Sequence, residues 1–250
     1  YVDITVLRGE NAEETPLHVE RRSIEVPTVE YQMLENQVGY IYVTQFDEVT
    51  AKQFEDAIDD LEDQGMEKLV IDLRNNPGGV LDTAVEMLAY VLPEDKLDGM
   101  LVYTADKNGE GDRYFCKAGK IQRESDDGSR DSRYPKEDDH ELDVPLAVLV
   151  NGNSASASEV FTGAVMDYDA GIVVGTTTFG KGIVQNLIPL GDGTAIKLTT
   201  AHYYTPNGFD LHGKGLEPDV VVEMDEELQK KAVVELSEDN QLQAAIEAMN

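Results

Sequence analysis

Two short apolar runs, each leading into a turn and then a predicted helix, constrain the fold of this chain most strongly. The first run covers 69–73 and is interrupted only by Asp72, and the second covers 145–150. Continuous apolar runs of this length are typical of strands in a sheet that is covered on both faces. Helices are predicted after the two turns, over 81–91 and 156–168. This alternation of buried strands with helices predicts an α/β core.

The remaining elements are predicted from periodicity and turn signals. A helix with one apolar stripe is expected to begin near Thr50 and to end at Gly65. Short strands are predicted at 1–8, 17–26, 39–45 and 172–175, an antiparallel pair at 183–190 and 194–204, and a last extended piece within 213–222. The pair is joined by Gly-Asp-Gly, which is a strong hairpin signal.

Two segments differ in composition from this core. Residues 105–142 are polar, charged and poor in aliphatic side chains, so we expect a long acidic surface excursion there. Residues 224–250 carry apolar stripes at helical spacing, and a C-terminal helical segment is predicted.

The charge balance excludes several classes of function. The chain of 250 residues has 50 acidic and 20 basic residues and a net charge of −30. Such a surface repels phosphate backbones and anionic lipid head groups, so we expect no nucleic-acid partner. Cys116 is the single cysteine, which excludes an internal disulfide. No His, Asp, Glu or Cys cluster has metal-ligand spacing, and neither a metal nor a cofactor is expected.

The turn after 145–150 is a candidate nucleophile site. Three serines, Ser154, Ser156 and Ser158, alternate there with small alanines. A serine at a strand-to-helix corner can expose its hydroxyl while the free N–H groups of the helix point at an anion. Serine is also a favoured helix cap, and local chemistry alone does not choose among the three.

Lys181 is a candidate general base. It lies between two glycines, with Phe179 before it and Ile183 after it. A lysine in apolar surroundings loses its proton more readily, and a neutral amine can activate a serine. The competing interpretations are an exposed hairpin lysine and a phosphate-binding lysine. The latter is weak without a longer glycine-rich loop.

Two further groups fit such a site. The turn 74–79 follows a buried strand, and its Gly78 and Gly79 can present N–H groups to an oxyanion. Gln185, four residues beyond Lys181, can orient the amine as a third member. Asp167 lies about 16 Å along the predicted helix from Ser156, which favours a supporting role. The four histidines occupy no motif, so a Ser-His-Asp triad is disfavoured.

Several segments, in one fixed order, together resemble the carboxy-terminal processing peptidases, the tail-specific serine protease family. The matching segments are Gly-Tyr-Ile-Tyr-Val-Thr-Gln-Phe (39–46), Leu-Val-Ile-Asp-Leu-Arg-Asn-Asn-Pro-Gly-Gly (69–79), Val-Asn-Gly-Asn-Ser-Ala-Ser-Ala-Ser-Glu (150–159), Thr-Phe-Gly-Lys-Gly-Ile-Val-Gln (178–185) and Tyr-Tyr-Thr-Pro-Asn-Gly (203–208). The resemblance spans about 25–223, and several motifs in order make a chance match improbable.

The resemblance implies a role for each candidate. It implies a ClpP/crotonase-like core in which Ser156 is the nucleophile, Lys181 the base and Gln185 the third member of the catalytic set. It gives the oxyanion donors as the amide of Ala157 and that of Gly78 or Gly79. The implied activity is that of a serine endopeptidase that cleaves proteins near their C-terminal tails through an acyl-enzyme.

The resemblance also sets the domain organisation that we expect. Residues 25–223 correspond to the peptidase core, and 1–24 to the end of a missing PDZ domain, with 1–8 as its final strand, and a linker. The implied partners are protein or peptide C-terminal tails, the PDZ domain and a homo-oligomer. The implied location is exported, in the cell envelope, with the full-length parent tethered to a membrane.

Two other functions are weighed against this one. A catalytically silent module on the same fold would hold peptide tails without cutting them. A crotonase-type acyl-CoA enzyme on a related core would use backbone oxyanion donors and carboxylates, and would not need Ser156 with Lys181.

Overall fold

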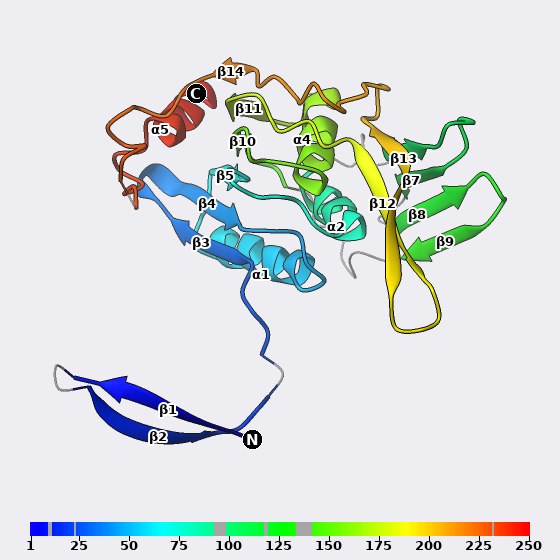
Figure 1. Ribbon diagram of the computed structural model, residues 1–250. Coiled ribbons are helices and arrows are strands. Elements are labelled where there is room, and N and C mark those ends of the chain that lie inside the picture. The colour runs from blue at the N-terminus through cyan, green and yellow to red at the C-terminus, as the bar shows by residue number, and fades with distance from the viewer. Residues whose placement is uncertain (10–11, 23, 93–98, 118–119, 134–141, 232) are drawn as a thin grey trace.

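The computed structural model describes residues 1–9, 12–22, 24–92, 99–117, 120–133, 142–231 and 233–250. The central element is a six-stranded sheet in the order β14-β11-β10-β5-β4-β3 (Figure 1). Its strands are β3 (Val29–Met33), β4 (Val38–Val43), β5 (Lys68–Asp72), β10 (Leu146–Val150), β11 (Ile172–Gly175) and β14 (Val220–Val221). All neighbours pair in parallel except β3, which runs antiparallel to β4 at the edge.

Helices cover both faces of this sheet. On one face lie α1 (Thr50–Asp63), α2 (Leu81–Val91) and α4 (Ala157–Asp167), and on the other lies α5 (Asn240–Ala248). The alternation along β5 shows the division, because Leu69 and Ile71 pack with the first group and Val70 packs with α5. The mixed α/β class predicted from the sequence is therefore confirmed.

A second sheet lies beside the core, in the order β12-β13-β6-β7-β8-β9. Its strands are β6 (Met100–Ala105), β7 (Asp112–Lys117), β8 (Lys120–Ser125), β9 (Arg130–Arg133), β12 (Ile183–Pro189) and β13 (Ala195–Tyr204). The hairpin β12–β13 agrees with the predicted antiparallel pair. It extends beyond the body of the protein (yellow in Figure 1).

The structure shows regular strands in the described part of the expected surface excursion over 105–142. Within it, β7, β8 and β9 form an antiparallel meander, and residues 134–141 lie outside the described part. Tyr114 and Cys116 lie on one face of β7 and are buried with Ile121 against the core. One buried face is enough to fix these strands, although their composition is mostly polar.

The two ends of the chain also differ in part from expectation. The N-terminal strands β1 (Val2–Arg8) and β2 (Glu13–Val19) pair with each other and stand apart from both sheets, joined by an exposed linker (Figure 1). β2 begins and ends earlier than the predicted 17–26 because Val19, Leu17 and Thr15 lie opposite the apolar residues of β1. Whether 1–24 belongs to a further domain stays a prediction.

The predicted C-terminal helical segment is shorter than expected. Its α-helix α5 spans 240–248, and the described residues of 226–238 form turns instead. Asp239 fixes the start of α5, because its carboxylate accepts hydrogen bonds from the N–H groups of Gln241 and Leu242.

We predict that Phe161→Ala lowers the free energy of unfolding by about 3–5 kcal/mol, as measured by urea denaturation. Phe161 lies on α4, is fully buried and packs near Phe46 with ring centroids 6.4 Å apart. Phe179→Ala is the matched control, because that side chain is 63% exposed and its loss is expected to cost less than about 0.5 kcal/mol. Equal effects of the two substitutions would contradict this account of the core.

Candidate active site

The candidate site lies where β5 and β10 end side by side. These neighbouring parallel strands point their carboxyl ends to the same edge of the sheet. The turn 73–80 follows β5 and the turn 151–156 follows β10, so the two turns touch. Ala155 N–H donates to the Asn76 carbonyl (3.0 Å) and joins them. Sites in open α/β sheets are found at this edge.

The three serines of the second turn have different environments. The Ser154 hydroxyl donates to the Leu73 carbonyl (2.7 Å) and the Ser158 hydroxyl to the Asn76 carbonyl (3.0 Å). Both side chains are fully buried in these structural contacts. The Ser156 hydroxyl donates to no acceptor among the residues that the structure describes. Ser154 and Ser158 hold the two turns together, which leaves Ser156 free for chemistry.

Ser156 also has a strained backbone. Its φ of 58° and ψ of −115° lie outside the regions that a residue with a side chain favours. Such a conformation costs about 1–3 kcal/mol, is held in place by its surroundings and is concentrated at functional sites. A serine at a sharp strand-to-helix turn has its hydroxyl at the corner, next to the N-terminus of the helix.

Free backbone donors lie beside Ser156. A Cβ placed on Gly78 would lie 2.8 Å from the Ala157 nitrogen and 2.8 Å from the Ser156 Cβ, so this turn needs glycine to pack against the serine. The Gly78 N–H itself donates to the Asn76 side chain (2.8 Å). In the described part of the chain, the N–H groups of Gly79 and Ala157 have no acceptor. The sequence left Gly78 and Gly79 open, and the geometry favours Gly79 as the donor.

Glu159 connects the serine to the lysine. Its carboxylate is fully buried and accepts four hydrogen bonds. The donors are Ser156 N–H (2.9 Å), Lys181 N–H (2.8 Å), Gly180 N–H (2.7 Å) and the Thr178 hydroxyl (2.6 Å). Hydrogen bonds to a carboxylate are about twice as strong as neutral ones. One side chain on α4 therefore holds the backbone of both candidate catalytic residues.

Sequence reasoning assigned Glu159 no role. The signal was present, because Ser-Ala-Ser-Glu (156–159) is the S-x-x-E pattern of a helix start, in which the glutamate side chain binds the first N–H. The pattern gives no sign of the contacts with Gly180 and Lys181, which lie more than twenty residues further along.

Lys181 is brought into the site through its backbone. Gly182 presses against His212, because a Cβ on Gly182 would lie 2.8 Å from the His212 nitrogen. On the other side of the lysine, Gly213 N–H donates to the Gly180 carbonyl (2.9 Å). The Lys181 side chain is half-buried. No carboxylate of the described residues lies within ion-pair distance of its ammonium.

The structure does not join the side chains of the predicted catalytic set. Among the described contacts, the Lys181 ammonium makes no hydrogen bond to the Ser156 hydroxyl. Gln185 is exposed on β12, where its amide donates weakly to the Thr199 hydroxyl (3.4 Å), and it does not contact Lys181. The register shifts between Val184 and Gln185, because Thr200 on β13 has no partner on β12, and Gln185 then pairs with Thr199.

Asp167 has the supporting role predicted for it. It lies at the far end of α4 and accepts a hydrogen bond from Asn207 N–H (2.7 Å). This contact fixes the loop after β13 and does not involve Ser156. In the described ranges, no three His, Cys, Asp or Glu side chains form a metal-binding group. No helix of the same ranges is long and apolar enough to cross a bilayer.

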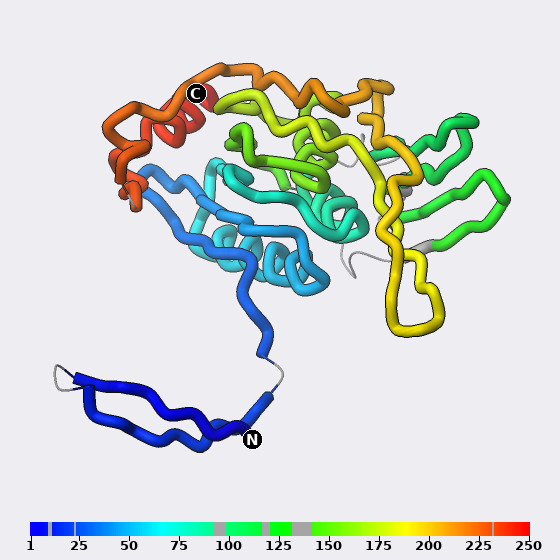
Figure 2. Tube along the Cα trace, viewed as in Figure 1, coloured from blue at the N-terminus to red at the C-terminus, as the bar shows by residue number. Residues whose placement is uncertain are grey.

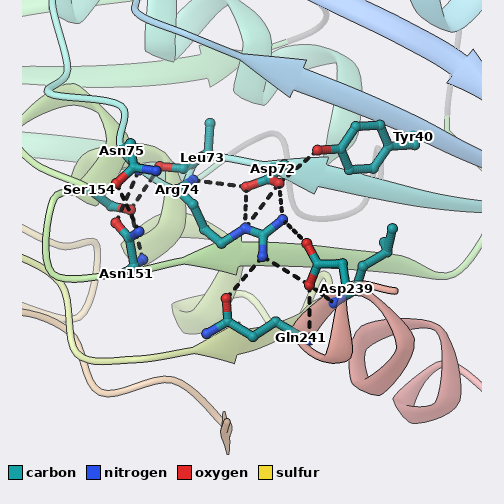
Figure 3. A network of polar contacts seen from close by, with 10 residues as sticks. Tyr40, Asp72, Leu73, Arg74, Asn75, Asn151, Ser154, Asp239 and Gln241 are labelled. Carbon is teal, nitrogen blue, oxygen red and sulfur yellow. Dashed lines mark hydrogen bonds and ion pairs between the residues drawn. The ribbon is translucent and has the colours of Figure 1, made fainter. Parts of the chain in front are cut away.

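A buried ion network lies behind the β5 turn (Figure 3). The Arg74 guanidinium pairs with Asp72 (2.5 Å) and with Asp239 (2.7 Å), and it donates to the Gln241 side chain (2.9 Å). The Tyr40 hydroxyl donates to Asp72 (2.7 Å). Burial, with the Asp72 carboxylate next to it, raises the pKa of Tyr40, so this hydroxyl stays a donor at neutral pH.

Comparisons with known proteins identify the family of this chain. The model of peptidase family S41 matches residues 37–222. Proteins named "Probable CtpA-like serine protease" are 37% identical over 222 residues in Staphylococcus aureus strain COL and 38% identical in Staphylococcus epidermidis. Each alignment covers 89% of this chain and 40% of the relative, so the chain spans about two fifths of the length of these curated relatives.

Solved structures show the same fold. The photosystem II D1 C-terminal processing protease is 28% identical, with a TM-score of 0.61 over 89% of this chain and 56% of that one. A Bacteroides fragilis protein assigned to the S41 proteases has a TM-score of 0.68 over 99% of this chain and 65% of that one. At 17% identity, the latter supports the fold alone.

We predict that Glu159→Gln lowers the free energy of unfolding by about 2–4 kcal/mol, as measured by urea denaturation. The amide NH₂ of glutamine would face N–H donors, so at least one of them would be left buried and unpaired. Glu226→Gln is the control, because Glu226 is exposed. If Glu159→Gln were as stable as this control, the carboxylate would not hold the site together.

Proposed function

Because the chain belongs to peptidase family S41, we propose that it is a serine peptidase core in which Ser156 is the nucleophile and Lys181 the general base. One observation carries the proposal. Ser156 is the serine of its turn whose hydroxyl has no acceptor among the described residues, and it lies at a strained corner against Gly78 and next to the unpaired amide of Ala157. A nucleophile next to oxyanion donors is the arrangement that acyl transfer requires.

The proposed reaction has two steps. In the first, Ser156 Oγ attacks the peptide carbonyl carbon and its proton passes to the Lys181 amine. The carbonyl oxygen becomes an oxyanion that accepts hydrogen bonds from the N–H groups of Gly79 and Ala157. The C–N bond then breaks, and Lys181 returns the proton to the leaving amine. In the second step, water attacks the ester carbonyl carbon and Lys181 takes its proton. The bond from that carbon to Ser156 Oγ then breaks, Lys181 returns the proton to Oγ, and the acid product leaves.

This mechanism requires the lysine amine to come within about 3 Å of Ser156 Oγ. The backbone that carries the lysine is already fixed by Glu159, so the approach is a side-chain movement. Gln185 is proposed as the residue that orients the amine. For that role it has to leave Thr199, and the bulge beside it is the point where β12 departs from regular pairing.

We propose that the substrate binds as an extended chain. β12 begins two residues after Lys181 and is the outermost strand of the second sheet. An edge strand offers a row of unpaired backbone groups to a peptide. The C-terminal tails of proteins are proposed as substrates, in line with the name of the photosystem II D1 C-terminal processing protease.

A second candidate is a catalytically silent module that binds peptide tails. The separation of Lys181 from the Ser156 hydroxyl and the exposed Gln185 favour it. The Ser156 hydroxyl, which donates to no acceptor among the described residues, and the unpaired amides of Gly79 and Ala157 favour the peptidase.

Further proposals concern a longer protein that contains this chain. Because the chain spans 40% of its curated relatives, substrate capture and regulation by a PDZ domain are proposed for a longer chain. We propose an exported location in the cell envelope, membrane tethering of the full-length parent, and a homo-oligomer, all from the family resemblance.

We predict that Ser156→Ala and Lys181→Ala each lower kcat/KM for a peptide substrate by about 10⁴-fold or more, because each removes a group that acts in the transition state. Lys197→Ala is the control. This lysine is exposed on β13 of the same hairpin, and its loss is expected to change the rate less than about twofold.

Labelling with a fluorophosphonate probe distinguishes the two candidates. The peptidase labels at Ser156, and neither Ser156→Ala nor Lys181→Ala does so at an appreciable rate. A wild-type chain that binds peptide tails and is never labelled would identify the silent module instead.

A further inference from the structure

The C-terminal segment returns to the candidate active site from the opposite end of the chain. Figure 2 shows it running from the yellow hairpin, along the orange stretch, to the red helix α5 at the other end of the molecule. α5 packs on the sheet face opposite α1, α2 and α4, with Leu242, Ala245 and Met249 in an apolar cluster. Figure 3 shows Asp239 and Gln241, at the start of α5, beside the guanidinium of Arg74.

Arg74 joins the two parts. Its guanidinium is buried and uses all three nitrogens. Nε and Nη2 donate to Asp72, Nη1 and Nη2 donate to Asp239, and Nη1 also donates to Gln241. Asp239 lies 165 residues further along the chain than Arg74. A guanidinium held in a planar fork by two carboxylates has one allowed orientation.

Arg74 is the first residue of the turn that borders Ser156. The residue after it, Asn75, has a left-handed φ of 61°, and its N–H donates to the Asn151 side chain (3.0 Å). Asn76 then accepts from Ala155 N–H and from the Ser158 hydroxyl. A shift of Arg74 therefore moves the turn that carries Gly79 and supports Ser156.

A cavity between the C-terminal segment and the sheet makes the ion pairs of Arg74 more important for holding the two together. A cavity of about 690 Å³ lies between the C-terminal segment and the carboxyl ends of the strands, lined among others by Asn75, Asn151 and Leu228. Packed side chains do not fix the segment against the turn there. The ion pairs of Arg74 do so at the border of the cavity.

We infer that Asp239 is a positioning residue for the serine turn and acts through Arg74. The C-terminal segment is then part of the active-site architecture and not only a cover of the sheet. This inference rests on the proposed function of Ser156, and it assigns to the segment a role in the geometry of the oxyanion donors.

The test compares Asp239→Asn with Leu242→Ala. Asparagine keeps the Oδ1 acceptor that caps α5, but its NH₂ group faces Arg74 Nη2, so two donors meet and the guanidinium turns. Leu242→Ala weakens the packing of α5 and leaves the ion network in place. Both variants are compared well below their melting temperatures, measured by circular dichroism.

Hydrogen exchange is the first readout, because it needs no catalysis. Asp239→Asn is expected to increase exchange by about tenfold or more in peptides covering 74–79 and 151–157, where the N–H groups of Asn75, Asn76, Gly78 and Ala155 are bound. Leu242→Ala is expected to increase exchange in α5 and to leave the two turns within about twofold of wild type. Unchanged turns in Asp239→Asn, or equal changes in both variants, would overturn the inference.

Kinetics is the second readout. Asp239→Asn is expected to lower kcat by about tenfold or more with KM within about twofold, since misplacement of a site costs rate. Leu242→Ala is expected to keep kcat within about twofold. A Leu242→Ala loss of kcat as large as that of Asp239→Asn would show a merely structural role.

The design separates the two proposals. If the wild-type chain neither cleaves peptides nor is labelled at Ser156, the proposed function fails and the exchange data still decide the role of Asp239. If Asp239→Asn does not fold, Gln241→Met removes another acceptor of the same guanidinium, and the same exchange comparison applies.

Discussion

The parallel pairing of β5 with β10 is the constraint on which the rest of the structure depends. Both strands are buried on both faces, so their order and register are fixed by packing on two sides. Their common direction places two turns in contact at one edge of the sheet. Ser156 and Gly79 lie in these turns, and the backbone of Lys181 is tied to Ser156 through Glu159, whereas Gln185 lies apart on β12. The position of the candidate site at this edge therefore follows from the parallel pairing of β5 with β10.

Two buried charges hold the turns from opposite sides. Glu159 accepts from the backbone of Ser156 and Lys181 on the side of the helices, and Arg74 is clamped between Asp72 and Asp239 on the side of α5. A buried charge is costly unless it is fully hydrogen-bonded, and once it is, the partners lose their freedom. The strained backbone of Ser156 needs such support, because a loose turn would relax.

The sequence predicted the parts of the fold whose signal is local. The runs 69–73 and 145–150 and the Gly-Asp-Gly hairpin carry their structure in neighbouring residues. The strands between 112 and 133 were predicted as an excursion, because few of their residues are apolar and only Tyr114, Cys116 and Ile121 are buried there. The contacts of Glu159 and Arg74 could not be predicted from the sequence for another reason. Their partners are distant in the chain, and no spacing rule links residues 74 and 239.

Lys181 differs from several other lysines of this acidic chain in having no carboxylate partner for its side chain among the described residues. With 50 acidic residues, a lysine near the surface readily finds a counter-ion, as Lys52, Lys230 and Lys231 do. No carboxylate in the described ranges pairs with Lys181. The carboxylate that contacts its backbone belongs to Glu159, whose oxygens are already occupied by four donors. Glu159 therefore fixes the backbone of the lysine and forms no ion pair with its side chain, so the amine is not tied to a counter-ion within the described ranges and can turn toward Ser156.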